Sequence, residues 1–156
     1  MRFLVNYKKI IMFPWKSKGL LFCLSQTIAV TLLIIGIRIF TDGMWLFGLP
    51  SLSEIQSVSI AYPALTEETK NSSDPEKIEL ALKLTGFLKY EIGKTPDPAE
   101  QPVITITYHL KDGTDQTISA SDSVVWWNGK SHVIRDKKTF IHLTEGIFFL
   151  EDLNGS

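Results

Sequence analysis

Three histidines, His109, His132 and His142, are the side chains of this sequence whose type could support metal or acid–base chemistry. Imidazole nitrogens and carboxylates are ligands that Zn²⁺ takes in hydrolytic sites, and aspartates stand near these histidines in the sequence. No two of the histidines have the H-x-H or H-x-x-x-H spacing that places two ligands on one face of a strand or a helix. Surface histidines without a metal are therefore the favoured interpretation, and an envelope-associated metal-dependent hydrolase that uses the three histidines is the alternative.

Other catalytic patterns are missing from the sequence. The strained G-x-S-x-G turn that holds a catalytic serine beside its base is absent. The ten glycines are scattered, so there is no glycine-rich phosphate loop, and the carboxylates show no spacing diagnostic of a glycosidase pair. The single cysteine, Cys23, excludes a thiolate zinc cluster and an internal disulfide. The sequence predicts a protein that is not an enzyme and binds no metal or cofactor.

Two adjacent tryptophans, Trp126 and Trp127, precede an Asn128-Gly129 turn signal and form the best candidate contact surface. Neighbouring strand residues point to opposite faces, so only one of the two indoles can enter a core. We expect the other on the outer face, beside His132 across the hairpin. An exposed indole can stack on a sugar or anchor a protein, or a helix or sheet edge can cover it. Trp126, Trp127, Asn128 and His132 are thus the predicted binding residues.

The charges of the chain divide it into two parts. The first 49 residues carry six basic side chains and one acidic side chain, whereas the remaining residues carry ten basic and sixteen acidic ones. A division this sharp indicates that the two parts lie in different surroundings. The acidic part contains no basic stripe, which argues against a nucleic-acid partner.

The elements that position these residues begin with an apolar stretch, Gly19 to Ile37, that contains no charged residue. A helix of that length spans about 28 Å, close to the hydrocarbon thickness of about 30 Å. Trp15 and Trp45 flank the stretch at a separation that suits two interfacial aromatic belts. The stretch predicts one transmembrane helix over residues 19–41, in contact with the lipid bilayer.

The basic residues before the apolar stretch predict its orientation, because Lys and Arg accumulate on the cytoplasmic side. We expect a basic cytoplasmic tail over residues 1–18, a juxtamembrane linker over 42–53 and an extracytoplasmic domain over 54–156. The favoured localisation is the cell membrane, as a single-pass signal anchor. A cleaved signal peptide is the alternative, although its apolar region is usually only about 7–15 residues long and no small-x-small cleavage site follows Phe40.

The first half of the predicted domain contains one strand and one helix. Alternation predicts a strand over Ile55–Tyr62, and the polar residues 66–73 predict a loop. The pair Asp74-Pro75 marks a helix start, with Asp as the N-cap and Pro in the first turn. We expect this helix to end near Gly93, and three prolines make residues 94–102 a loop.

The second half predicts an antiparallel meander. Apolar and polar residues alternate over Val103–Leu110, with the apolar ones on one face. Asp112-Gly113 and Asn128-Gly129 are hairpin signals, because glycine adopts positive φ without strain. They link strands at about 115–119, 123–127 and 131–135, and the first strand of the domain can add an edge to this four-stranded sheet.

Residues 137–150 permit two structures. Asp136 can cap a helix in which Phe140, Leu143, Ile147 and Leu150 share a face, whereas Gly146 permits a hairpin. With either structure the expected fold class is α+β. A single N-terminal transmembrane helix precedes a small antiparallel sheet of four or five strands, packed with one or two helices.

Three segments, ITITYHLKDGT, VVWWNGKSH and FIHLTEGIFF, resemble a domain at the C-terminus of small membrane-anchored or secreted proteins of Gram-positive bacteria, a family of unknown function. The resemblance implies a bacterial cell-surface setting and transfers no catalytic or binding residue. The predicted function is a membrane-anchored extracytoplasmic binding module without enzymatic activity. Its expected partner is another membrane protein, such as a transporter or sensor, or a component of the cell envelope.

Overall fold

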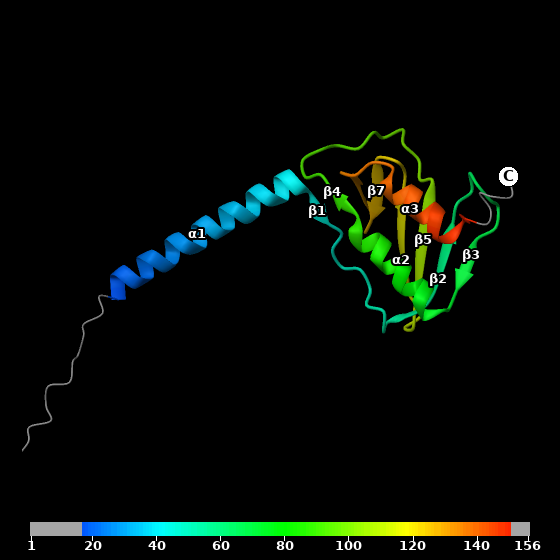
Figure 1. The fold of residues 1–156 in the computed structure, drawn as a ribbon, viewed down its shortest axis with the longest axis horizontal. Coiled ribbons are helices and arrows are strands. Elements are labelled where there is room, and N and C mark those ends of the chain that lie inside the picture. Colours follow the sequence, from blue (N-terminus) through cyan, green and yellow to red (C-terminus); the bar gives the residue numbers. More distant parts are fainter. Residues whose placement is uncertain (1–16, 151–156) are drawn as a thin grey trace, which may run out of the picture. The chain divides into compact units, whose positions relative to one another are not determined.

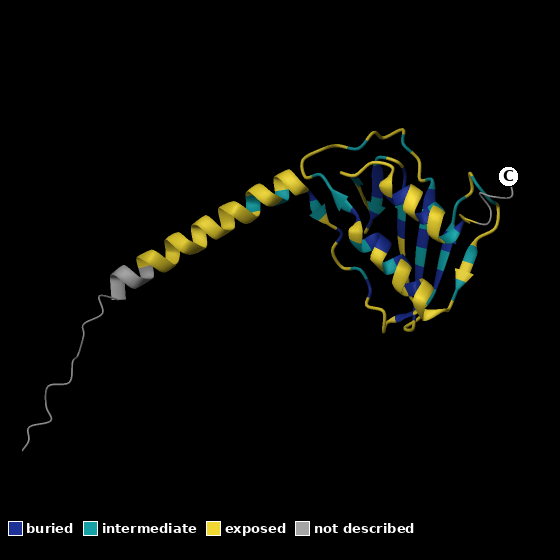
Figure 2. Ribbon diagram, viewed as in Figure 1, coloured by how far each residue is buried: buried dark blue, intermediate teal, exposed yellow. Residues whose placement is uncertain are grey.

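A computed structural model describes residues 17–150 of the chain, and it describes their side chains from Phe22 onwards. The chain divides into two compact units between Ile37 and Arg38. The helix α1 (Ser17–Asp42) has 26 residues, and from Phe22 onwards its side chains are exposed almost throughout (Figure 2). Its segment Phe22–Asp42 is long and apolar enough to cross a membrane, as either an anchor or a signal sequence.

The hydroxyl side chains within α1 bond to the main chain of the same helix. Thr27 Oγ1 donates to the oxygen of Cys23 at 2.9 Å, and Thr31 Oγ1 donates to the oxygen of Thr27 at 2.8 Å. Ser25 Oγ makes a similar bond to the oxygen of Phe22 at 2.8 Å. These bonds satisfy the hydroxyl groups without water, so these three residues are compatible with an apolar environment.

The second unit is built on a six-stranded antiparallel sheet with the strand order β3-β2-β5-β6-β7-β8. Its strands are β2 (Ile55–Ala61), β3 (Lys70–Ser72), β5 (Ile104–Leu110), β6 (Asp115–Ala120), β7 (Val124–Trp127) and β8 (Lys130–Val133). The predicted meander is β5 to β8, and β2 joins it by pairing with β5. The predicted loop over residues 66–73 is partly wrong, because its residues 70–72 form the edge strand β3 beside β2. The α+β fold class is confirmed, with more strands than expected.

A two-stranded sheet joins the linker to the domain. The strand β1 (Met44–Trp45) pairs with β4 (Lys89–Tyr90) in antiparallel register. The helix α2 (Pro75–Phe87) therefore ends earlier than the predicted end near Gly93. Leu88 is extended, with φ −62° and ψ 121°, and its main-chain N–H bonds to the oxygen of Thr85, which turns the chain into β4.

The predicted cap of α2 is confirmed. Asp74 accepts a hydrogen bond from the main-chain N–H of Glu76 at 3.0 Å, which satisfies a donor that the first turn leaves open. The helix buries the side chains of Ile78, Ala81 and Leu84 against the sheet.

The last element, α3 (Thr139–Phe148), is a helix and not a hairpin. Asp136 does not cap it: Lys138 holds the N-cap position with φ 67° and no side-chain cap. The main-chain N–H of Lys138 bonds to the oxygen of Asp122 at 3.0 Å, which fixes the helix start beside the turn between β6 and β7. Of the four apolar residues predicted to share a face, only Phe140 is buried. The buried residues of α3 are Phe140, Ile141 and Thr144, whereas Leu143, Ile147 and Leu150 are exposed.

Both α2 and α3 lie on one face of the six-stranded sheet, and the core fills the space beneath them (Figure 1). Tyr108 is completely buried there, and its hydroxyl oxygen lies 2.9 Å from Thr85 Oγ1 of α2. Burial raises the pKa of the Tyr108 phenol far above its ordinary value, so this group stays protonated. Neither α2 nor α3 lies on the opposite face of the sheet, which we call the open sheet face (Figure 1).

Candidate functional site

The predicted tryptophan pair divides between the two faces of β7. Trp127 enters the core, and its indole Nε1 donates a hydrogen bond of 2.8 Å to the main-chain oxygen of Phe47. Trp126 is half-buried on the open sheet face, opposite Ser119 on one side and Ser131 on the other. Only Trp126 of the pair is therefore placed to contact a ligand on the open face.

His132 does not lie beside Trp126, so that expectation is wrong. The register of the β7–β8 hairpin places His132 opposite Val125, which points into the core. The imidazole packs on the ring of Tyr90, with a centroid distance of 4.3 Å and an interplanar angle of 34°. Burial, and after it the charge of Lys130, lowers the pKa of His132 below its ordinary value.

Three of the four predicted binding residues meet at one shallow hollow of about 290 Å³. Trp127, Asn128 and His132 line it together with Phe47, Tyr90 and Lys130. Asn128 occupies the hairpin turn with a left-handed φ of 49°. Phe47 comes from the linker and is held at the hollow by the bond from Trp127, whereas Tyr90 comes from β4 and forms a β-bridge with Ile134. No local pattern around the tryptophans could have indicated them.

A larger and more apolar hollow lies between α2 and α3. It has a volume of about 450 Å³ and is lined mainly by apolar side chains, among them Leu84, Phe87, Phe140 and Leu143. Phe87 is 72% exposed and Leu143 is 44% exposed, although both are large apolar residues.

The same row of apolar residues continues along both helices. Leu80 of α2 and Ile147 of α3 are exposed and line a neighbouring hollow together. We define the interhelical groove by the following residues: Leu80, Leu84 and Phe87 of α2, and Phe140, Leu143 and Ile147 of α3. Three of the four residues predicted to share a face of the last helix, Phe140, Leu143 and Ile147, therefore form one wall of this groove.

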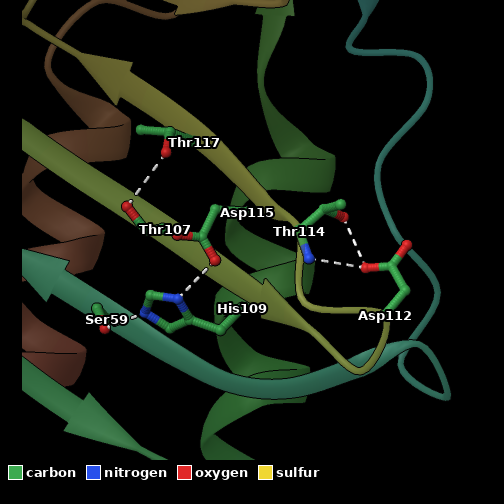
Figure 3. A network of polar contacts seen from close by, with 7 residues as sticks. All are labelled: Ser59, Thr107, His109, Asp112, Thr114, Asp115 and Thr117. Carbon is green, nitrogen blue, oxygen red and sulfur yellow. Dashed lines mark hydrogen bonds and ion pairs between the residues drawn. The ribbon is translucent and has the colours of Figure 1, made fainter.

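A chain of polar contacts crosses three strands on the open sheet face (Figure 3). Ser59 Oγ of β2 lies 2.7 Å from His109 Nε2 of β5, and His109 Nδ1 lies 2.8 Å from Asp115 Oδ1 of β6. Beside it, the hydroxyl oxygens of Thr107 and Thr117 are 3.3 Å apart. This arrangement fixes the orientation of the imidazole.

The contacts run from serine to histidine to aspartate, as in a serine-hydrolase triad, but the position of the serine in the fold is different. Ser59 lies in the middle of β2, and the register pairs it with Asn71 of β3 and with Thr107 of β5. An oxyanion hole needs main-chain N–H groups aimed at the reacting carbonyl, whereas N–H groups in a ladder are committed to neighbouring strands. We therefore interpret Ser59, His109 and Asp115 as a cross-strand polar ladder.

The alternative of a three-histidine metal site finds no support in the structure. His109 lies on the open sheet face, His132 packs on Tyr90, and His142 Nδ1 on α3 lies 3.2 Å from Glu145 Oε2. Within the part of the chain that the structure describes, no three His, Cys, Asp or Glu side chains come together to hold a metal ion.

Comparisons with protein-family models, with curated proteins and with solved structures find no significant match. The surfaces of the chain itself must therefore indicate its function. Three surfaces among the described residues of the second unit expose large apolar or aromatic side chains: the interhelical groove, the hollow beside the linker and the open sheet face that carries Trp126.

Proposed function

We propose that the protein is a single-pass, membrane-anchored binding module whose second unit lies outside the cell and binds a neighbouring membrane protein. The apolar helix α1 and the basic residues before the apolar stretch support the anchor and its orientation. The resemblance to a domain of Gram-positive surface proteins supports a bacterial envelope setting. The proposed binding surface is the interhelical groove.

The exposure of apolar side chains along two adjacent helices carries this proposal. Exposed apolar side chains border both hollows of the groove: Phe87 and Leu143 lie at the first, and Leu80 and Ile147 lie at the second, whose lining is partly polar. Single exposed apolar residues are common on proteins, whereas contiguous apolar patches mark interaction sites. Burying one leucine or phenylalanine side chain contributes about 1.5–3 kcal/mol, so covering these four residues would supply substantial binding energy.

The shape of the groove supports a helical partner. Amphipathic helices bind to grooves of this kind by inserting apolar residues spaced at i, i+3, i+4 and i+7. An amphipathic segment of a transporter or sensor at the membrane surface has this chemistry. Anchoring both proteins in one membrane raises the effective concentration of the partner, so a modest groove suffices.

Crosslinking in native membranes tests the groove. We expect Leu143→Glu in the full chain to abolish a specific crosslinked band, because the new carboxylate would be buried against apolar partner atoms. Leu52→Glu is the matched control, since Leu52 and Leu143 are 41% and 44% exposed. Loss of the band in both variants, or in neither, while both keep the wild-type melting temperature, contradicts binding in the groove.

A second candidate ligand is an envelope glycan on the open sheet face. The half-exposed indole of Trp126 beside the Ser119 and Ser131 positions favours it, because sugars combine stacking on aromatic rings with hydroxyl hydrogen bonds. Trp126→Ala would then reduce retention of the protein on purified cell-wall material. Leu143→Glu would leave that retention unchanged, which separates the two candidates.

A further inference from the structure

The first residues after α1 are folded onto the domain. The strands β1 and β4 pair directly, and Gly43 adopts a φ of +77° just before them. A Cβ atom at this position would lie 3.0 Å from the main-chain oxygen of Tyr90, so glycine permits the close approach. Two positions past β1, Phe47 accepts the hydrogen bond from Trp127. The linker therefore has a defined surface that belongs to the second unit.

This surface exposes aromatic rings. Trp45 is 52% exposed and Phe47 is 62% exposed. The ammonium group of Lys89 lies 4.7 Å from the centroid of the Trp45 ring, in a cation–π contact. The half-buried rings of Tyr90 and His132 pack on each other at the hollow that Phe47 lines. We call this set the linker-end surface: Trp45, Phe47, Lys89, Tyr90, Lys130 and His132.

A lysine lies near each of the two exposed rings. Lys130 lines the same hollow as Phe47, and Lys89 covers Trp45. Glu91, the carboxylate that follows β4, is already held by Lys94 at 2.5 Å. Exposed aromatic rings together with lysines are the combination found at the boundary between a bilayer and water, where lysine stems reach lipid phosphates.

The length of the connecting chain restricts where this surface can be. Trp45 follows Asp42, the last residue of α1, by three residues, and Phe47 follows it by five. Because a fully extended chain covers at most about 3.6 Å per residue, the Cα atoms of Trp45 and Phe47 stay within roughly 11 Å and 18 Å of the helix end. A helix that ends at the bilayer surface therefore keeps both rings near the lipid headgroups.

We infer that the linker-end surface docks on phospholipid headgroups of the outer leaflet, with Trp45 and Phe47 at the interface and Lys89 and Lys130 on lipid phosphates. This inference rests on the proposed membrane anchor. Docking restricts the rotation of the second unit about its tether. The groove would then be presented to partners in a limited range of orientations, which reduces the entropy lost on binding.

The test uses the full chain in protein-free vesicles, with Cys23 replaced by serine and a fluorophore on a new cysteine. Phe47→Cys reports on the linker-end surface, and Trp45→Cys gives a second, independent reading. Thr117→Cys on the open sheet face is the control, because Thr117 is exposed and lies on the other side of the sheet. The vesicles contain phosphatidylcholine, with or without phosphatidylglycerol, and headgroup-labelled quencher lipids.

We expect the reporters at positions 47 and 45 to be quenched several-fold more than the reporter at position 117. Phosphatidylglycerol should increase the difference, and Lys89→Glu with Lys130→Glu should remove most of it. Quenching that survives this charge reversal contradicts the phosphate contacts.

Flotation of the same vesicles separates failure of the docking from failure of the anchor. If the protein floats with the vesicles but all three reporters are quenched equally, docking is wrong and the anchor stands; this surface then belongs to a protein partner. A protein that does not float overturns both the anchor and the docking inference.

Discussion

The indole nitrogen of Trp127 and the main-chain oxygen of Phe47, 80 positions apart in the chain, are joined by a hydrogen bond of 2.8 Å. Together with the β1–β4 pairing, this bond makes part of the linker an integral segment of the second unit. The predicted spacer between membrane and domain is therefore partly folded structure. One residue that lines the hollow, Phe47, therefore follows the last residue of α1 by only five positions.

Replacing Trp127 by phenylalanine should loosen this connection. The aromatic ring remains, but the donor to Phe47 is lost, so we expect unfolding to become easier by about 0.5–1.5 kcal/mol. Amide exchange at residues 46–49 should accelerate. Chemical denaturation and hydrogen exchange measure the two effects. Trp126→Phe on the other face is the control, and an equal change in both variants would contradict this role of the bond.

Gly43 and Gly48 provide a matched pair of substitutions to alanine. Both have left-handed φ values, +77° and +78°, so both substitutions carry a backbone cost of about 1–2 kcal/mol. Only Gly43 has a main-chain atom 3.0 Å from its added Cβ, whereas the nearest atom at Gly48 is 4.0 Å away. We expect a larger drop in the melting temperature for Gly43→Ala. Equal drops would mean that the approach of Gly43 to Tyr90 relaxes freely.

The buried hydroxyls of Thr85 and Tyr108 should respond unequally to removal. Thr85 Oγ1 can donate to the main-chain oxygen of Ala81 at 3.1 Å while it accepts from Tyr108. Tyr108→Phe leaves the Thr85 hydroxyl with a hydrogen-bond partner and should lower the free energy of unfolding by about 1 kcal/mol. Thr85→Val leaves the buried phenol of Tyr108 without a partner and should lower it by about 1–3 kcal/mol.

A double-mutant cycle measured by denaturation checks this asymmetry. The combined variant should be more stable than Thr85→Val alone, because no buried donor is then left without an acceptor. Additive losses would contradict a direct contact between the two hydroxyl groups.

Stability should fall in mild acid because of His132. Burial and Lys130 lower its pKa in the folded state, so the unfolded chain binds a proton more readily than the folded protein does. The neutral imidazole favours folding fully above the unfolded pKa of about 6.5, and this advantage is lost progressively as the pH falls below that value.

Melting temperatures at about pH 7.5 and about pH 5.5 measure this effect, since the window brackets the ordinary histidine pKa. His132→Gln should reduce the loss between the two pH values, whereas His142→Gln, at an exposed position on α3, should not. The lowered pKa values of Glu54, Glu91 and Glu100 place their titration below this window. If His132→Gln and the wild type lose stability equally, the imidazole is not responsible.

The meander could be predicted from the sequence because alternating side chains within a strand and glycines within a turn are signals carried by neighbouring residues. Alternation over β5 placed Ile104, Ile106 and Tyr108 in the core, and Gly113 and Gly129 adopt the positive φ values that their turns require. The strands β1, β3 and β4 could not be predicted, since strands of two or three residues pair through their main chains and show no side-chain pattern.

The buried face of α3 could not be predicted for a different reason. Helical spacing identifies an apolar stripe but does not show which protein covers it. Leu143 and Ile147 fit the stripe, yet the structure turns them toward the groove and buries Ile141 and Thr144.

The face of the sheet on which His132 lies could have been predicted from the register of the hairpin. A two-residue turn at Asn128-Gly129 pairs Trp127 with Lys130, and counting back two pairs places His132 opposite the core residue Val125. The other residues that line the hollow of His132 could not be predicted from the register. Phe47 and Tyr90 lie far away in the sequence, and only the tertiary fold brings them to the same hollow.

Protease accessibility of a C-terminal tag in intact cells tests the proposed topology most directly. We expect added protease to remove the tag and the second unit from intact cells, while an N-terminal fragment that contains α1 stays in the alkaline-carbonate-insoluble membrane fraction. A tag that is protected until the cells are lysed would contradict the outward orientation. A tagged protein found in the culture medium without its N-terminal segment would contradict the anchor.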